Sequence, residues 1–214
     1  MYDSAAEMIA KKKQTASIVC IVAAVVLAGS LFLPWLKNKS RRGSVTMSLL
    51  STKMCAGCES MSNLKLAREL TRQYESAKQL REEFGRDGDD DARMPLPEKP
   101  GTAFAYVALA TLVVCLLAAA ALAAAGILGL KGRFITQPMA LTSVGLVAAC
   151  LGLVLGCVFL AIKPAGVGLG ASWPFFLFGA AVVAAVAGAQ MLAKAFAPPE
   201  YDPYADPGVD APLA

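Results

Sequence analysis

The clearest indication of the fold lies in residues 102–130, whose sequence is TAFAYVALATLVVCLLAAAALAAAGILGL. The stretch contains no Asp, Glu, Lys or Arg, and apolar residues fill it instead of following one helical face. A helix of about 20 such residues crosses the hydrocarbon core of a lipid bilayer. The stretch therefore predicts a membrane-spanning helix, which is long enough to tilt or to extend beyond the lipid.

Three further apolar runs repeat this pattern at 17–36, 134–162 and 172–196. Lys194 is the only charged residue in them, and it stands near the end of the last run, where a lysine reaches the interface. The sequence therefore predicts an all-α membrane protein, a bundle of four transmembrane helices with a small extracytoplasmic cap. The expected partner of this bundle is the lipid bilayer.

Composition excludes several classes of function. Of the 214 residues, 57% are apolar, which does not fit an ordinary soluble domain, and a net charge of +4 gives no footprint for nucleic acid. The chain has no His, which is the commonest general base and a common metal ligand. Ion-coupled transport needs charges within the membrane, and these spans lack them. We therefore expect no cofactor and no metal.

A stripe of small residues follows one face of the run 134–162. Its members, spaced four, three and four residues apart, are Gly145, Ala149, Gly152 and Gly156. Small residues let a second helix approach closely inside a membrane. Two interpretations remain open: the stripe packs within the four-helix bundle, or it forms a face for self-association.

Basic residues gather on one side of the predicted spans. Short loops rich in Lys and Arg stay on the cytoplasmic side of a membrane. The residues concerned are Lys11, Lys12, Lys13, Lys131, Arg133 and Lys194, against only Lys163 in the opposite short loop. We expect both tails, 1–16 and a disordered 197–214, in the cytoplasm, and the loop 37–101 outside the plasma (cytoplasmic or inner) membrane.

The loop 37–101 divides into three parts. Residues 45–54 predict one short strand, and 85–101 form an acidic and proline-rich linker. Between them, about 62–84, apolar residues at helical spacing predict an amphipathic helix, with Leu66, Leu70, Tyr74, Ala77, Leu80 and Phe84 on one face. This helix packs on the strand or on the membrane, or it binds a partner.

Cys55 and Cys58 form a Cys-x-x-Cys motif in the same loop. A metal site needs about four ligands, and residues 37–101 contain no other Cys and no His. Two alternatives remain. In an oxidising compartment the pair forms a disulfide that stabilises the loop. The same spacing also lowers a thiol pKa and supports thiol–disulfide exchange.

Several stretches resemble the claudin and peripheral myelin protein superfamily of four-span proteins. Leu33-Pro34-Trp35, at the end of the first span, matches the Trp with which that family's first outer loop opens. Residues 49–55 fall where the family's Gly-Leu-Trp-x-x-Cys lies, and GLGASWPFFLFGAAVVAAVAG (168–188) looks like its fourth span. The resemblance implies inward termini and a first outer loop that carries strands and two cysteines and ends in a helix. It also implies a role in organising membranes, in adhesion or beside other membrane proteins. Trp35 would then anchor the bundle at the outer interface, as aromatic belts do.

The alternative is a membrane thiol–disulfide oxidoreductase. Bacterial disulfide-forming quinone reductases also have four spans and a Cys-x-x-Cys in the loop after the first. Their second cysteine pair has no counterpart here, because the loop between the third and fourth spans, KPAGVGLGA (163–171), contains no cysteine. We therefore expect a non-enzymatic interaction or accessory protein, with exchange chemistry at Cys55 and Cys58 as the second choice.

Overall fold

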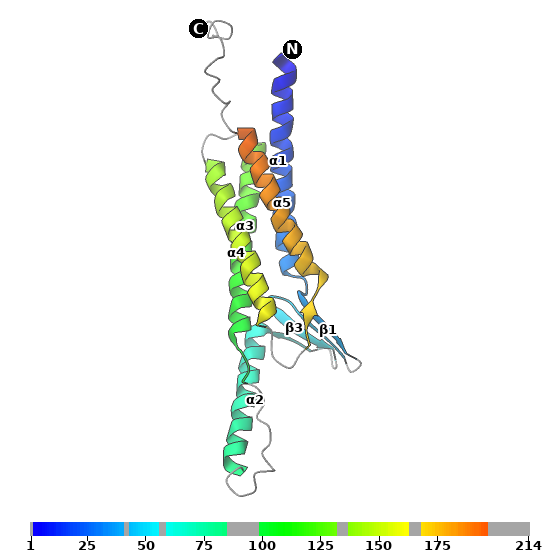
Figure 1. Ribbon diagram of the computed structural model, residues 1–214, viewed down its shortest axis with the longest axis vertical. Helices are drawn as coiled ribbons and strands as arrows, with labels where there is room; N and C mark the ends of the chain where they lie inside the picture. Colours follow the sequence, from blue (N-terminus) through cyan, green and yellow to red (C-terminus); the bar gives the residue numbers. More distant parts are fainter. Residues whose placement is uncertain are drawn as a thin grey trace.

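A computed structural model of the chain describes residues 2–40, 43–55, 59–84, 99–131, 137–162 and 168–196. It is an elongated molecule in which four long helices lie side by side and a small sheet closes one end of them (Figure 1). The tail 197–214 and most of the linker 85–101 lie outside the described residues. The fold is mostly helical.

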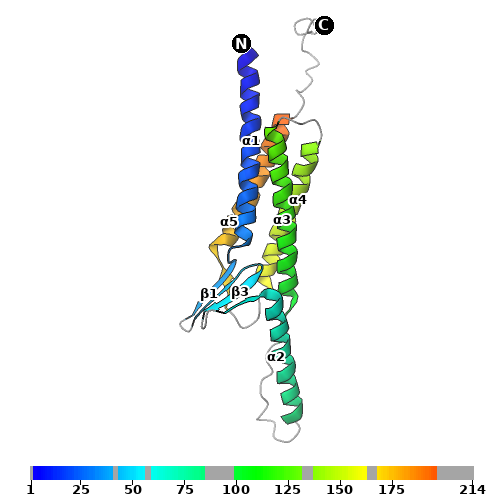
Figure 2. The ribbon, with the colours of Figure 1, turned by 180° about the vertical axis from the view of Figure 1, so that it is seen from behind.

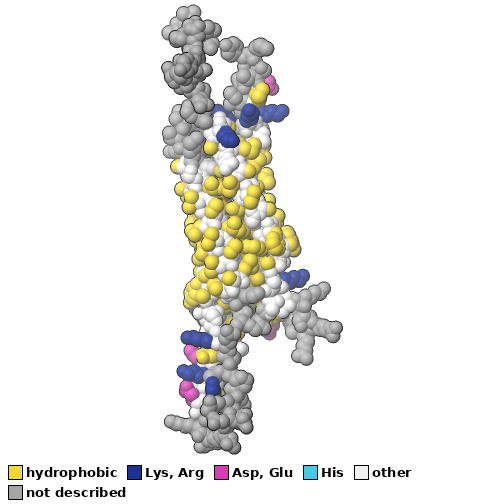
Figure 3. All heavy atoms as spheres, viewed as in Figure 1, with side chains coloured by type: hydrophobic (Ala, Val, Ile, Leu, Met, Phe, Trp, Pro, Cys, Tyr) yellow, Lys and Arg dark blue, Asp and Glu magenta, His cyan; other side chains and the backbone are white. Residues whose placement is uncertain are grey.

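The four long helices are α1 (Tyr2–Leu31), α3 (Ala103–Leu130), α4 (Gln137–Ala161) and α5 (Trp173–Phe196). Each contains an apolar stretch of at least 22 residues, and by length and composition each can cross a membrane. The prediction of four long apolar helices is confirmed. Figure 3 shows a band of hydrophobic side chains on the face of these helices that is in view, with Lys and Arg side chains at both ends of the band.

The first helix differs from its predicted range at both ends. It begins at Tyr2, so residues 2–16 of the expected tail are helical, and it ends at Leu31 instead of residue 36. The amides of Phe32 and Leu33 donate to the carbonyls three residues earlier, Gly29 and Ser30, and this spacing tightens the last turn. Pro34 cannot continue a helix, and Leu36 already belongs to a strand.

The helices pack as a ring in the order α1, α3, α4, α5. The extensive contacts are those of α3 with α4 and of α1 with both α3 and α5, whereas α4 and α5 touch less. Alanines form much of the core, including Ala23, Ala108, Ala118 and Ala185. Such small side chains allow the helix backbones to approach closely, which is how helices associate where lipid replaces water.

The prediction of one short strand in the cap, at 45–54, is wrong in the number of strands. The structure has a five-stranded antiparallel sheet in the order β4-β3-β2-β1-β5. Its strands are β1 (Leu36–Ser40), β2 (Gly43–Met47), β3 (Ser51–Cys55), β4 (Glu59–Ser62) and β5 (Gly170–Ala171). The predicted strand is two strands joined by a turn. In this turn the hydroxyl of Ser48 donates to the carbonyl of Ser51 and accepts from its amide. β5 comes from the loop between α4 and α5 and pairs with the start of β1.

Helix α2 (Asn63–Phe84) starts within one residue of its predicted position. Leu66 and Ala67 are buried in the core, whereas Leu80 is exposed. In both ribbon views α2 points away from the bundle, beyond the near end of α3 (Figures 1 and 2). The first turns of α2 are therefore fixed to the sheet and α3, and the remainder projects. We call the sheet and α2 together the lobe.

Candidate functional site

Trp35 joins the helices to the sheet. Its side chain is fully buried, and its indole Nε1–H donates to the carbonyl of Ser30 in the last turn of α1 at 2.8 Å. Its backbone amide donates to Met47 of β2 at 3.0 Å. Its carbonyl accepts from the amide of Ser172, just before α5, at 2.7 Å. One residue thus connects the end of α1, the sheet and the start of α5, and we call this region the Trp35 junction.

The indole ring lies against three aromatic rings. The centroid distances are 4.9 Å to Phe178, 5.6 Å to Phe175 and 6.5 Å to Phe159, with tilted or edge-to-face geometry. Such pairs add about 0.5–1.5 kcal/mol each beyond the area they bury. The junction therefore also holds α4 to α5 at the end where the sheet lies.

The interpretation of Trp35 as an aromatic-belt residue needs correction. A belt residue faces the lipid headgroups, whereas Trp35 has no exposed surface. The aromatic side chains that face outward at this end of the helices are different ones: Phe32, Tyr106, Trp173 and Phe176 are each at least 60% exposed. The sequence alone did not separate the buried tryptophan from the exposed one.

The small-residue stripe of α4 faces the inside of the bundle. All four residues are buried. A methyl group on Gly145 would touch Leu122 of α3, one on Gly152 would overlap the sulfur of Cys115, and one on Gly156 would lie 2.9 Å from Cζ3 of Trp35. Ala149 belongs to the same core. The stripe packs within the bundle, so it does not offer a surface to a second copy.

Two glycines that sequence reasoning missed bring α1 close to its neighbours. A methyl group on Gly126 of α3 would lie 2.8 Å from the carbonyl oxygen of Ser17. One on Gly188 of α5 would lie 3.0 Å from the sulfur of Cys20. A larger residue at position 126 would require a shift of the backbone at Ser17, and one at position 188 would require its neighbours on α1 to move by a few tenths of an ångström. These two contacts fix the register of α1 against α3 and α5.

Asn63 is a second residue that sequence reasoning missed. Its side chain is buried at the start of α2, where its Oδ1 accepts from the hydroxyl of Thr52 at 2.9 Å. Its Nδ2 donates to the carbonyls of Ser48 and Leu49 at 2.9 and 3.0 Å. Asparagine is common at helix starts, which is the signal that points to it. Here it ties the β2–β3 turn to α2.

Cys55 is the last residue of β3 and is exposed. Met54 pairs with Glu59 of β4, and Cys55 pairs with Ser44 of β2. Cys58 lies outside the described residues, and the pairing of Cys55 with Cys58 stays a prediction. Exposure leaves the Cys55 thiol accessible to a reagent or to a partner thiol.

The interior of the bundle carries little reactive chemistry in the part that the structure describes. None of the buried side chains there is charged. The hydroxyls of Ser30 and Thr111 bond to carbonyls of their own helices at 2.7 Å. No group of three or more His, Cys, Asp or Glu among the described residues is placed to hold a metal ion.

Comparison of the chain with models of known protein families finds no match, and neither does comparison with curated proteins. The features that bear on function are therefore the Trp35 junction, the projecting lobe and the exposed Cys55.

Proposed function

We propose that this protein is a non-enzymatic integral membrane protein whose lobe binds other membrane proteins, a second copy or an adjacent membrane. It would act in membrane organisation, in adhesion or as an accessory subunit of a membrane complex. The observation that supports this best is the Trp35 junction, which holds the sheet on a bundle whose described buried side chains carry no charge. A fixed lobe presents its surface in one orientation to a partner.

The outside of the bundle supports insertion into lipid. Large apolar side chains are exposed on α1, α3, α4 and α5, among them Val25, Leu117, Val147 and Val183. In water such a continuous apolar surface would drive aggregation, whereas in a bilayer it contacts acyl chains. We propose that all four helices cross the plasma (cytoplasmic or inner) membrane.

The orientation follows from the basic residues. The first turns of α1 and the last turns of α3 and α5 lie at the end of the bundle opposite the sheet (Figures 1 and 2). The lysines at this end are Lys11, Lys12 and Lys13 of α1, Lys131 directly after α3 and Lys194 of α5, and by the positive-inside rule they support a cytoplasmic location. The lobe then lies outside the cell, and both termini lie inside.

We further propose a distant relationship to the claudin and peripheral myelin protein superfamily, on the residues Trp35, Cys55 and Cys58. The chain order of a first apolar helix, four strands, α2 and a second apolar helix is consistent with that relationship. The sheet also contains a strand that was not expected, β5, which comes from the loop between α4 and α5.

Crosslinking in intact membranes tests the proposed function. The amines of Lys53, Lys65 and Lys78 are exposed on the lobe, and a membrane-impermeant amine crosslinker should join them to a small, recurring set of membrane proteins or to a second copy. Replacing these three lysines with arginine keeps the charge and removes the reactive amines, so the same crosslinks should disappear. Efficient reaction of the lysines without any recurring crosslinked partner would contradict the proposal.

A second candidate function is thiol–disulfide exchange, which the exposure of Cys55 favours. The redox experiment in the Discussion separates a structural disulfide from an exchanging one.

A further inference from the structure

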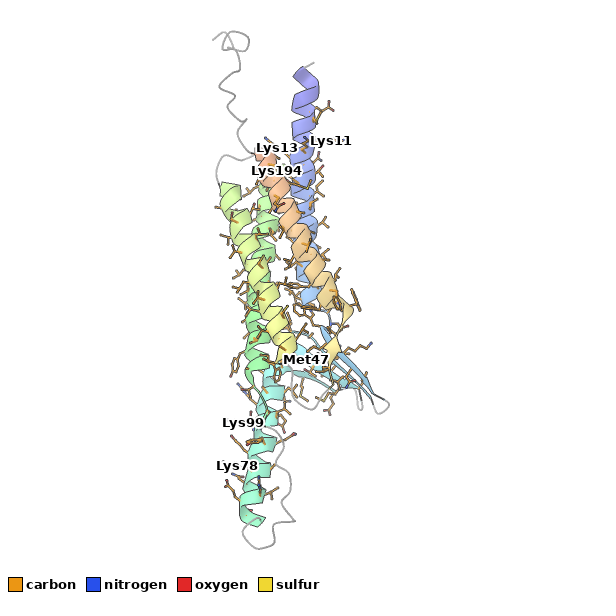
Figure 4. All side chains as sticks on the ribbon, in the orientation of Figure 1. Lys11, Lys13, Met47, Lys78, Lys99 and Lys194 are labelled. Atoms are coloured by element: carbon orange, nitrogen blue, oxygen red, sulfur yellow. The ribbon has the colours of Figure 1, made fainter. Side chains whose placement is uncertain are left out.

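Five lysines surround the end of the bundle opposite the sheet, and we call them the lysine collar. They are Lys11, Lys12 and Lys13 of α1, Lys131 at the end of α3 and Lys194 in the last turn of α5. Figure 4 shows Lys11, Lys13 and Lys194 near one another at this end, and Figure 3 shows the basic side chains where the apolar band stops. We infer that the collar binds the headgroups of anionic phospholipids.

Helix register places the α1 and α3 lysines at one level. Gly126 lies against Ser17, and the two helices run in opposite directions. Lys131 follows Gly126 by five residues, and Lys13 precedes Ser17 by four. At a rise of 1.5 Å per residue the two lysines lie about 7.5 and 6 Å beyond the same contact point.

The lysines of α1 and α5 also lie at one level along the bundle. Gly188 lies against Val19 and Cys20. Lys194 is six residues beyond Gly188, which is about 9 Å, and Lys13 is six residues before Val19, which is the same distance. Three helices therefore bring their lysines to one plane across the bundle.

The collar has an excess of positive charge. Among the side chains that the structure describes at this end, Glu7 is the only carboxylate, and it lies one helical turn further out than Lys11. The lobe differs, because α2 mixes both signs and pairs some of them, as Lys78 and Glu82 do at 3.7 Å. The exposed ammonium groups of Lys11, Lys12, Lys131 and Lys194 therefore favour an anionic partner.

The position of the collar identifies that partner as lipid. Exposed apolar side chains adjoin it on the bundle side: Ile18 on α1, Ile127 and Leu130 on α3, and Met191 on α5. A lysine at such a boundary lays its methylene stem on apolar surface and places its ammonium at the level of the phosphates. A soluble anion would need no apolar rim. This inference rests on the proposed insertion into a membrane.

Native mass spectrometry of the full chain in micelles tests the inference. The micelles contain equal amounts of phosphatidylglycerol and phosphatidylcholine, and the measurement counts the lipids that stay bound. Each lysine near an anionic surface favours it by up to about fivefold. We expect at least a tenfold preference for phosphatidylglycerol, and a preference below about twofold after replacement of four exposed collar lysines with glutamine. These are K11Q, K12Q, K131Q and K194Q.

A matched variant removes four exposed cations from the lobe: K53Q, K65Q, R68Q and R72Q. It should keep the preference of the unaltered protein. Equal binding of the two lipids by the unaltered protein, or an equal loss in both variants, overturns the inference. Resistance to alkaline extraction from cell membranes separates the two proposals. A chain that resists extraction but shows no preference fails this inference alone, whereas an extracted chain also fails the proposed membrane function.

Discussion

Gly156 lies directly against the indole of Trp35: a methyl group at this position would be 2.9 Å from Cζ3 and 3.4 Å from Cη2 of that ring. Gly156, the last small residue of the α4 stripe, thus leaves the space that the Trp35 ring fills. Since the ring also touches Phe175 and Phe178 of α5, it has little room to move aside. The stripe and the junction form one packing unit.

Gly156→Ala should destabilise the bundle by about 1–3 kcal/mol, because the added methyl overpacks the junction. Gly179→Ala is the control, since nothing lies within 4 Å of a methyl group there. In a helix that change is neutral or stabilising. Thermal unfolding in detergent measures both, and equal melting temperatures for the two variants would show that the indole yields without cost.

Trp35→Ala should cost about 3–5 kcal/mol, because it empties a core site and leaves the aromatic cluster without its centre. Trp173 is the only other tryptophan, and it is 64% exposed. Trp173→Ala should therefore change the unfolding free energy by less than about 0.5 kcal/mol. Tryptophan fluorescence during unfolding follows each variant by its remaining indole. If Trp173→Ala lowered the unfolding free energy more than Trp35→Ala does, the junction would not be a main source of stability.

Asn63→Ala should release α2 and the β2–β3 turn. The change leaves two backbone carbonyls and the Thr52 hydroxyl without their side-chain partners, at a cost of about 1–3 kcal/mol. We expect faster proteolysis at 48–63 while the helices remain protected. Ser60→Ala, an exposed change on β4, is the control. Unchanged proteolysis in Asn63→Ala would remove this residue from the account of the lobe.

The Cys55 thiol should react with a polar maleimide only after reduction, because we expect it to be paired with Cys58. In a Cys58→Ser variant it should react at once, since Cys55 is exposed. Cys115 is fully buried and serves as the unreactive control in both. A structural disulfide should also have a low reduction potential and no exchange with a quinone or a thioredoxin-like protein. Rapid exchange would instead support the oxidoreductase function.

The sequence predicted the long helices because a run without charge is a strong local signal, and it placed α2 from its helical periodicity. It did not predict the sheet, because β1 reads LKNKS and β5 has two residues. These strands depend on a pairing between Leu36 and Ala171, which are far apart in the chain.

The packing residues were harder to predict for a related reason. Gly126 and Gly188 are two of 18 glycines, and only the identity of the neighbouring helix gives them a role. Trp35 stood out in the sequence, but its burial depends on Phe159 and Phe178 from two later helices. Local patterns thus predict elements, whereas the junction arises from contacts between distant segments.

The central claim is that four helices cross the lipid, with the lobe on one side of the membrane and both chain termini on the other. The most direct test places single cysteines in a cysteine-free chain in intact cells and adds a membrane-impermeant maleimide. We expect labelling at Ser60→Cys, Ser76→Cys and Gly168→Cys. We expect none at Glu7→Cys or Lys131→Cys until the membrane is permeabilised. Labelling of both groups from the same side, or protection at Ser76→Cys, would contradict the account.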